Sequence, residues 1–225
     1  MLLESTIRHL ALSVGFDDCL TAPACRLDSD AAFMDSWVDS GYAGNMTYLE
    51  RNRELRYDIR QLVPQAETVI VTLLTYDHSG RDYHRTVKSK LYELKAALIH
   101  QLETESIPLE TAFHPIHQHI FCDSAPVLER RWATLAGLGF IGLNHQFIHP
   151  TLGSRVHIGE LVMNLPCQRD VVRSSIPKTC TQCNRCVEAC PAQALGQPHW
   201  DATRCIAYTT HHCLVCQQVC PHNTN

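Results

Sequence analysis

Apolar residues recur at helical spacing in two stretches of the chain. Between Leu2 and Val14 they occupy one helical face, at Leu3, Ile7, Leu10, Ala11 and Val14. From about Thr86 to Glu103 the same steps of three and four residues recur, at Val87, Leu91, Leu94, Leu98 and Leu102. Side chains at these steps share one face of a 3.6-residue helix, so both stretches are predicted to be amphipathic helices.

Other stretches have the pattern of strands. Val69 to Tyr76 is a continuous apolar, β-branched run, typical of a strand buried on both faces. His119–Asp123 and Arg155–Leu165 are predicted to be further strands, the first ending where Ser124, Pro126 and Glu129 signal the start of a helix. Strands alternating with helices predict a mixed fold of the α/β (α+β) class, with Asp123 at a strand-to-helix junction.

Three glycines form a possible nucleotide-binding motif. Gly137, Gly139 and Gly142 have the G-x-G-x-x-G spacing. That motif needs a strand before it and a helix after it. A predicted helix precedes Gly137 and turn-rich sequence follows Gly142, so we interpret these glycines as turns.

The composition narrows the class of protein. The chain has 225 residues, 45% hydrophobic and 19% charged, which suffices for a folded core in one or two domains. No apolar run approaches the roughly 18 to 20 residues of a membrane span, so no membrane association is expected. The net charge of -4 excludes a globally basic nucleic-acid binder but allows a local basic patch.

Eight of the twelve cysteines are concentrated at the C-terminal end. They run as Cys180-x2-Cys183-x2-Cys186-x3-Cys190-Pro191, then Cys205, then Cys213-x2-Cys216-x3-Cys220-Pro221. In the bacterial C-x2-C-x2-C-x3-C-P pattern, three thiolates hold one iron-sulfur cluster and the fourth cysteine ligates the other cluster. By that rule Cys180, Cys183, Cys186 and Cys220 hold one 4Fe-4S cluster. Cys190, Cys205, Cys213 and Cys216 hold the second.

A disulfide framework and structural zinc are the alternatives. Disulfides need an oxidising compartment, whereas the first residues show no continuous apolar segment of signal-peptide type, so a cytoplasmic protein with reduced thiols is expected. Paired C-x2-C units can bind zinc, but zinc would leave Cys186, Cys190, Cys205 and Cys220 without a role. The spacing therefore favours two clusters.

Several ordered blocks of this sequence resemble one enzyme family. They are Gly41–Arg51, Leu62–Pro64, Gly80–His84, Asp123–Arg130, Ala136–Gly142, Gly159–Leu161, the cysteine array and Asp201–Tyr208. On these blocks the chain resembles the epoxyqueuosine reductases, cobalamin-dependent iron-sulfur enzymes of queuosine tRNA modification. The resemblance implies a nitroreductase-like cobalamin-binding catalytic domain at residues 1–165. A ferredoxin-like domain with two 4Fe-4S clusters would follow at residues 166–225.

The resemblance also implies a reaction and a proton donor. Epoxyqueuosine at the tRNA wobble position would be reduced to queuosine, with electrons passing from the clusters to cobalamin. Asp123 matches the family's proton donor, and a carboxylic acid can serve so near neutral pH if burial raises its pKa. From the residues alone, Asp123 could instead cap the helix predicted to begin at Ser124.

Cobalamin contacts are implied at five positions. Besides Asp123, Arg51 matches a contact whose guanidinium could bind a carboxamide or phosphate. Ile158, Val162 and Ala207 would line the same cofactor by backbone or apolar packing. Arg81, Asp82, Tyr83 and His84 are further polar candidates, or simply a loop that caps the helix near Thr86.

The chain departs from the family at several points. Leu143 replaces the usual lysine, and the segments after Tyr76 and after Cys205 are shortened. The sequence ends at Asn225, so we expect a short form without the C-terminal region that grips tRNA in relatives. Phosphate contacts could come from two groups: Arg51, Arg53, Arg56 and Arg60, or Arg81, Arg85, Lys88 and Lys90.

The expected partners are the tRNA substrate carrying epoxyqueuosine and an external electron donor, and a monomer is the expected state. Two other functions remain open. One is a paralogous cobalamin-dependent reductase of a small molecule, and the other is a 4Fe-4S electron-transfer protein without a corrinoid.

Overall fold

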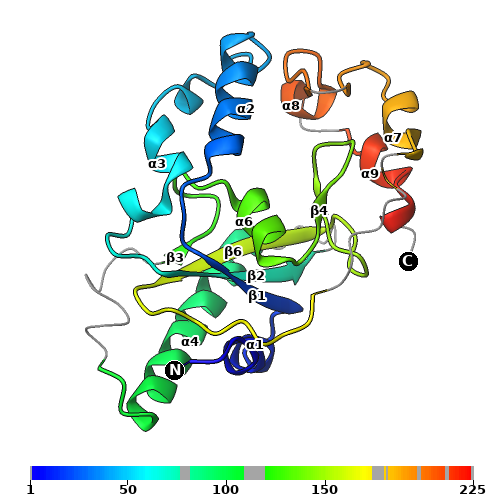
Figure 1. Cartoon of the computed structure of the whole chain (residues 1–225). Coiled ribbons are helices and arrows are strands. Elements are labelled where there is room, and N and C mark those ends of the chain that lie inside the picture. The colour runs from blue at the N-terminus through cyan, green and yellow to red at the C-terminus, as the bar shows by residue number, and fades with distance from the viewer. Residues whose placement is uncertain are drawn as a thin grey trace.

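A four-stranded sheet forms the centre of the molecule (Figure 1). The computed structural model describes residues 2–76, 82–108, 120–173, 180, 182–196, 199–210 and 213–223. The strands are β1 (Asp18–Pro23), β2 (Thr68–Thr75), β3 (Ile120–Phe121) and β6 (Val156–Met163). Their order is β1-β2-β6-β3, and each neighbouring pair is antiparallel. The predicted mixed fold is confirmed.

Helices cover both faces of this sheet (Figure 1). On one face lie α1 (Glu4–Ser13) and α4 (Tyr83–Thr104), and on the other lies α6 (Glu129–Ala136). All five leucine and valine positions of the predicted second helix are fully buried, as the periodicity requires. Residues from β2 enter the cores on both sides, which explains its continuous apolar run within an antiparallel sheet.

The helix predicted after Asp123 begins later than its sequence signals. Helix α6 starts at Glu129, and Leu128 occupies its N-cap position, so Asp123 does not cap it. The helix ends at Gly137, whose φ of 90° is in the left-handed region that glycine adopts most easily. A two-stranded hairpin follows, of β4 (Phe140–Ile141) and β5 (Phe147–Ile148). Gly137 thus lies in the turn after α6 and Gly142 begins the turn of the hairpin, as interpreted, whereas Gly139 directly precedes β4.

The remaining short elements lie beyond α6, on the side of the sheet away from α1 and α4 (Figure 1). From the N-terminal part come α2 (Asp28–Asp39), η1 (Thr47–Leu49), α3 (Arg53–Tyr57) and η2 (Ile59–Gln61). The C-terminal part contributes α7 (Arg185–Glu188), α8 (Ile206–Thr210), α9 (Val215–Gln218) and η4 (Pro221–Asn223). The two parts meet where Trp37 stacks on Trp200, with ring centroids 5.6 Å apart.

The segment that follows β6 packs on the N-terminal part. The Glu4 N–H donates to the Gln168 carbonyl at 2.9 Å, and Arg173 donates to the fully buried Glu4 carboxylate at 2.6 Å. Residues 174–179, and His119 of the predicted strand His119–Asp123, lie outside the described residues. Within the described part, no helix is both long and apolar enough to cross a membrane.

Candidate active site and cysteine cavities

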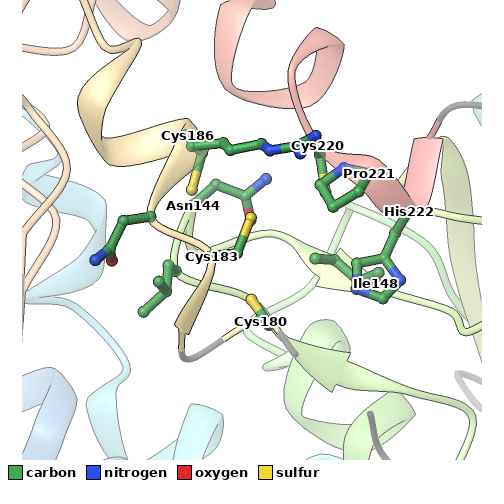
Figure 2. A pocket seen from close by; sticks show the side chains of 11 residues that line it. Asn144, Ile148, Cys180, Cys183, Cys186, Cys220, Pro221 and His222 are labelled. Atoms are coloured by element: carbon green, nitrogen blue, oxygen red, sulfur yellow. The ribbon is translucent and has the colours of Figure 1, made fainter. Parts of the chain in front are cut away.

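Four cysteines surround one cavity of about 280 Å³. They are Cys180, Cys183, Cys186 and Cys220, the set that the spacing assigns to the first cluster. Figure 2 shows them gathered from separate segments, with Asn144, Ile148, Pro221 and His222 beside them. Cys220 arrives from a position 30 or more residues after the other three, so the chain folds back as the crossing pattern requires.

The β4–β5 hairpin forms one wall of this cavity, and two glycines allow its close approach. A Cβ at Gly139 would lie 2.2 Å from the Ile148 carbonyl oxygen. A Cβ at Gly142 would lie 2.5 Å from Ile148 Cδ1 and 3.5 Å from the Cys180 sulfur. Both glycines therefore allow close packing against Ile148, and Gly142 also lies beside the Cys180 sulfur.

The C-terminal turn forms another part of the wall. Asn223 Oδ1 accepts the Ser154 N–H at 2.7 Å, and Asn223 Nδ2 donates to the Ser154 hydroxyl at 2.8 Å and the Gln217 carbonyl at 2.9 Å. His222 packs edge-on against Phe140, with centroids 5.4 Å apart. These contacts hold the turn that carries Cys220, which is only 6% exposed.

The other four cysteines line a second, smaller cavity of about 40 Å³. They are Cys190, Cys205, Cys213 and Cys216, again the set that the crossing rule predicts. The Ala194 N–H donates to the Cys190 sulfur at 3.3 Å. Ala207, Ile206 and Val215 complete an apolar wall. Among the described residues, no three His, Cys, Asp or Glu side chains are arranged to hold a single metal ion.

A cavity of about 550 Å³ lies where the N-terminal and C-terminal parts meet. Its apolar wall includes Trp37 and Trp200, and its polar side chains include Asp30, Arg131 and His145. Gly142 also lines it, which places the Cys180 sulfur close to its wall. The volume is within the usual range for small-molecule and cofactor sites.

An adjoining cavity of about 190 Å³ contains the predicted proton donor. Asp123 and Ile158 line it, and it shares Glu129 and Arg130 with the larger cavity. Arg130 reaches across to donate to the His145 carbonyl at 2.9 Å. The structure thus places Asp123 and Ile158 together, beside the larger cavity.

Asp123 is exposed rather than buried. Its φ of 49° is in the left-handed region, which Asp tolerates better than most residues. Its backbone N–H donates to Glu129 Oε1 at 2.5 Å. The expectation that Asp123 lies buried at the end of its strand is wrong, because the chain turns outward there before α6 begins.

Two glutamates near Asp123 were not predicted as site residues. Burial, followed by the charge of Asp123, raises the pKa of Glu129 to about 8. Glu160 in β6 is fully buried, and burial raises the pKa of its carboxyl well above the ordinary value. The sequence feature that could have indicated Glu160 is its position as a charged residue in the middle of the apolar strand predicted for Arg155–Leu165.

The other predicted cobalamin contacts line neither the cavity of about 550 Å³ nor the one of about 190 Å³. Arg51 is exposed on the segment before α3. Val162 is fully buried in the core on the α6 side of the sheet, two positions along the same face of β6 from Glu160. Ala207 lines the second cysteine cavity.

The polar block before α4 is partly described. Asp82 caps α4, since its carboxylate accepts the Arg85 N–H at 3.0 Å. Tyr83 stacks on His157 of the smaller cavity, with centroids 5.5 Å apart, and His84 Nε2 is 2.7 Å from the Cys122 carbonyl. Arg81 lies outside the described residues.

The first predicted basic group is largely paired within the protein. Arg53 forms ion pairs with Asp35 and Asp39, both at 2.9 Å. Arg60 pairs with Asp58 at 2.8 Å. Arg56 donates to the Arg51 carbonyl at 2.7 Å.

In the second group, Arg81 lies outside the described residues, and the Lys90 ammonium donates to the Val14 carbonyl at 2.6 Å. Partnered cations offer less to phosphates, which argues against the first group and Lys90 as a tRNA-binding patch, whereas Arg85 on α4 is exposed.

Comparisons with known proteins identify the family. Residues 175–196 match the family model described as a 4Fe-4S binding domain. The epoxyqueuosine reductase of Leadbetterella byssophila is 32% identical over 252 residues, covering 97% of this chain and 79% of that protein.

Two solved structures share the fold. The epoxyqueuosine reductase of Streptococcus thermophilus gives a TM-score of 0.81 at 23% identity, covering 100% of this chain and 67% of that one. An epoxyqueuosine reductase crystallised with an epoxyqueuosine-modified tRNA-Tyr stem loop gives a TM-score of 0.79 at 24% identity. The match covers 98% of this chain and 65% of that one. With a relative above 30% identity that is matched over most of its length, the chain belongs to the epoxyqueuosine reductase family of oxidoreductases.

Proposed function

We propose that this chain reduces epoxyqueuosine to queuosine at the tRNA wobble position. The observation that carries the proposal is the proximity of Cys180 to Gly142, because Gly142 lines the larger cavity and Asp123 lines the one that adjoins it. The proposed cluster at Cys180, the larger cavity that could hold a cofactor, and the acid Asp123 thus lie next to one another in space. The relatives named for this reaction, one of them with a modified tRNA stem loop, support the same assignment.

The cysteine sets are suited to hold two 4Fe-4S clusters. Each set of four lines its own cavity, and thiolate sulfur is the ligand that such clusters require. In this proposal residues 166–225 form the ferredoxin-like domain, and residues 1–165 form the catalytic domain. An external electron donor would reduce the clusters.

The residues around the larger cavity fit cobalamin. A corrinoid has a broad apolar face edged by amides, and the cavity combines tryptophan walls with Arg130, Arg131 and Asp30. Bound cobalamin would supply a cobalt centre able to deliver electrons to the epoxide carbon. Ile158 would approach the cofactor from the adjoining smaller cavity, with Val162 packed behind it, while Arg51 and Ala207 would have to contact parts of the cofactor that extend beyond the two cavities.

Asp123 is proposed to protonate the oxygen that leaves the epoxide. Its side chain is exposed within the smaller cavity, so a substrate there can approach it within hydrogen-bonding distance. Arg130 lines both cavities and can orient an anionic or carbonyl group beside it. Tyr83 and His157, stacked on one another, lie at the border of the smaller cavity.

The test is an anaerobic titration of the cluster-reconstituted protein with cob(II)alamin, followed by turnover of an epoxyqueuosine-modified stem loop with dithionite as reductant. Saturable binding and formation of queuosine are expected. Binding without turnover of the stem loop would point to a paralogous reductase of a small molecule. Clusters without cobalamin binding would point to an electron-transfer protein, and would overturn the proposal.

A further inference from the structure

The peptide group between Cys122 and Asp123 is hydrogen-bonded at both of its ends. Its carbonyl oxygen, which belongs to Cys122, lies 2.7 Å from His84 Nε2. Its N–H, which belongs to Asp123, donates to Glu129 Oε1 at 2.5 Å. In a planar trans peptide the carbonyl and the N–H point in opposite directions. Two side chains therefore hold one rigid unit from opposite sides, immediately before the Cα atom that carries the proposed acid.

The two side chains come from helices on opposite faces of the sheet (Figure 1). His84 lies in the first turn of α4, and Glu129 is the first residue of α6. Each helix is fixed by buried side chains, among them Val87 of α4 and Trp132 of α6. The Cys122 side chain is itself buried in the core on the α4 side. Groups on packed helices are positioned more precisely than groups on loops, so both contacts have a rigid base.

Both contacts are compatible with the chemistry of their side chains at neutral pH. A carbonyl oxygen only accepts hydrogen bonds, so His84 carries a proton on Nε2, as it can in its neutral form and does in its charged form. Burial raises the pKa of Glu129 to about 8. Because a carboxyl oxygen can accept a hydrogen bond whether the group is protonated or ionised, the contact with the Asp123 N–H does not require Glu129 to change its protonation state.

The backbone at Asp123 needs such support. Its φ of 49° is a conformation that residues other than glycine adopt rarely. It lies in the segment 122–128 between β3 and α6, where the one backbone hydrogen bond given among the described residues runs from the Val127 N–H to the Ala125 carbonyl. A strained backbone persists only where its surroundings hold it. Without the two side-chain contacts, we expect the segment to relax and the Asp123 carboxyl to change its direction.

We propose that His84 and Glu129 are positioning residues that fix the direction in which Asp123 points into the smaller cavity. This inference rests on the proposed function, in which Asp123 is the acid. The two contacts set the plane of the peptide and so the direction of the Asp123 Cα–Cβ bond. A general acid must lie within roughly 2.6 to 3.2 Å of the atom that it protonates, so this direction decides whether the proton can be transferred. Neither positioning residue needs to exchange a proton with the substrate.

The test compares alanine and glutamine at both positions, in the enzyme that contains its clusters and cobalamin. His84→Ala and Glu129→Ala should each lower kcat for the modified stem loop by about 10- to 100-fold, with KM changed by less than about 3-fold. A glutamine amide can donate in place of His84 Nε2 and accept in place of Glu129 Oε1, so His84→Gln and Glu129→Gln should recover most of the lost activity. His100→Ala and Glu103→Ala, exposed changes on α4, should behave like the wild type.

The double variant His84→Ala/Glu129→Ala shows whether the two side chains act on one peptide group. If they do, loss of either contact already frees the peptide, and the double variant should lose little more kcat than the weaker single variant. Losses that multiply would mean two independent roles, and would overturn the proposal that both residues hold one unit.

Amide hydrogen exchange of the substrate-free protein, followed by mass spectrometry, provides a readout that does not need turnover. A peptide that covers residues 120–128 should exchange slowly at Asp123 in the wild type and the glutamine variants, and faster in the alanine variants. Unchanged exchange in both alanine variants would overturn the proposal, as would unchanged kcat in an active enzyme. If the exchange is as expected but the wild type does not reduce the stem loop, the proposed function fails, and the positioning role in that reaction fails with it, while the two contacts stand.

Discussion

Asn223 and Ser154 are joined by two hydrogen bonds, one from the Ser154 N–H at 2.7 Å and one to its hydroxyl at 2.8 Å. Through this pair the last described turn is fixed to the segment before β6. Because the same turn carries Cys220, the geometry of the first cysteine cavity depends on an amide side chain that is hydrogen-bonded to Ser154 and Gln217.

Replacing Asn223 with alanine should therefore loosen the first cluster site. The change removes both bonds to Ser154 and the bond to the Gln217 carbonyl, at a cost of about 1 to 3 kcal/mol in free energy of unfolding. Anaerobic denaturation and the iron content of the reconstituted protein would measure the effect. Gln218→Ala, an exposed change in α9, should leave both at wild-type values.

Alanine at Gly139 should destabilise the β4–β5 hairpin. The added Cβ would meet the Ile148 backbone at 2.2 Å, and a backbone cannot move aside as a side chain can. A loss of about 3 kcal/mol is expected, at the upper end for overpacking. Gly196→Ala is the matched control, because its nearest contact would be an ordinary 3.6 Å. Equal thermal stability of the two variants would contradict this reading of the hairpin.

Because the pKa values of Glu129 and Glu160 are raised in the folded protein, the free energy of unfolding should fall as pH rises. A carboxyl with a raised folded-state pKa binds its proton more tightly in the folded protein than in the unfolded chain. Between the ordinary glutamate value of 4.5 and about 8, each pH unit should therefore cost up to about 1.4 kcal/mol per such group. Denaturant unfolding across this range should show a smaller slope in Glu160→Gln than in the wild type; an identical slope would argue against a protonated Glu160.

Asp123→Asn should strongly reduce turnover while preserving cofactor binding. Asparagine keeps the shape of the side chain but cannot donate the acidic proton, so kcat should fall by about 10²- to 10⁴-fold. The affinity for cob(II)alamin, measured by absorbance, should stay near that of the wild type. Asp28→Asn, an exposed change at the start of α2, serves as the control and should retain full activity.

Cysteine variants should separate cluster ligands from other thiols. Cys205→Ala removes one of the four cysteines of the second cavity and should reduce the bound iron by the content of one cluster. Cys167→Ala changes a half-buried thiol that lines neither cysteine cavity, and should retain all the iron. Iron and sulfide analysis with electron paramagnetic resonance would show the difference. Full iron in Cys205→Ala would contradict the proposed ligand set.

The features that the sequence predicts best are local ones. The buried faces of α1 and α4 and the run of β2 follow directly from the side-chain period. Helix α2 gave no such signal, because only Ala31 and Trp37 are buried and Phe33 remains 41% exposed. The start of α6 was misplaced because Ser124 and Pro126 belong to a turn before the helix, although both are common at helix starts.

The arrangement of the site depends on contacts that are distant in the sequence. The cysteine spacing predicted which four cysteines line each cavity, because the spacing of cluster ligands can be seen in the sequence itself. Nothing local indicated that Gly142 would bring Cys180 to the larger cavity, or that Glu160 would lie near Glu129. The role of a glutamate in an apolar strand can be inferred only when the residues that surround it in the fold are known.

The absence of a side chain at Gly142 also bears on the speed of electron delivery. Electrons cross proteins by tunnelling, and the tunnelling rate decreases exponentially with the width of the gap. If Cys180 ligates a cluster as proposed, the glycine leaves only backbone atoms at this point between the cysteine sulfur and the cavity. A larger residue at position 142 would then be expected to slow electron transfer from the cluster to the cavity.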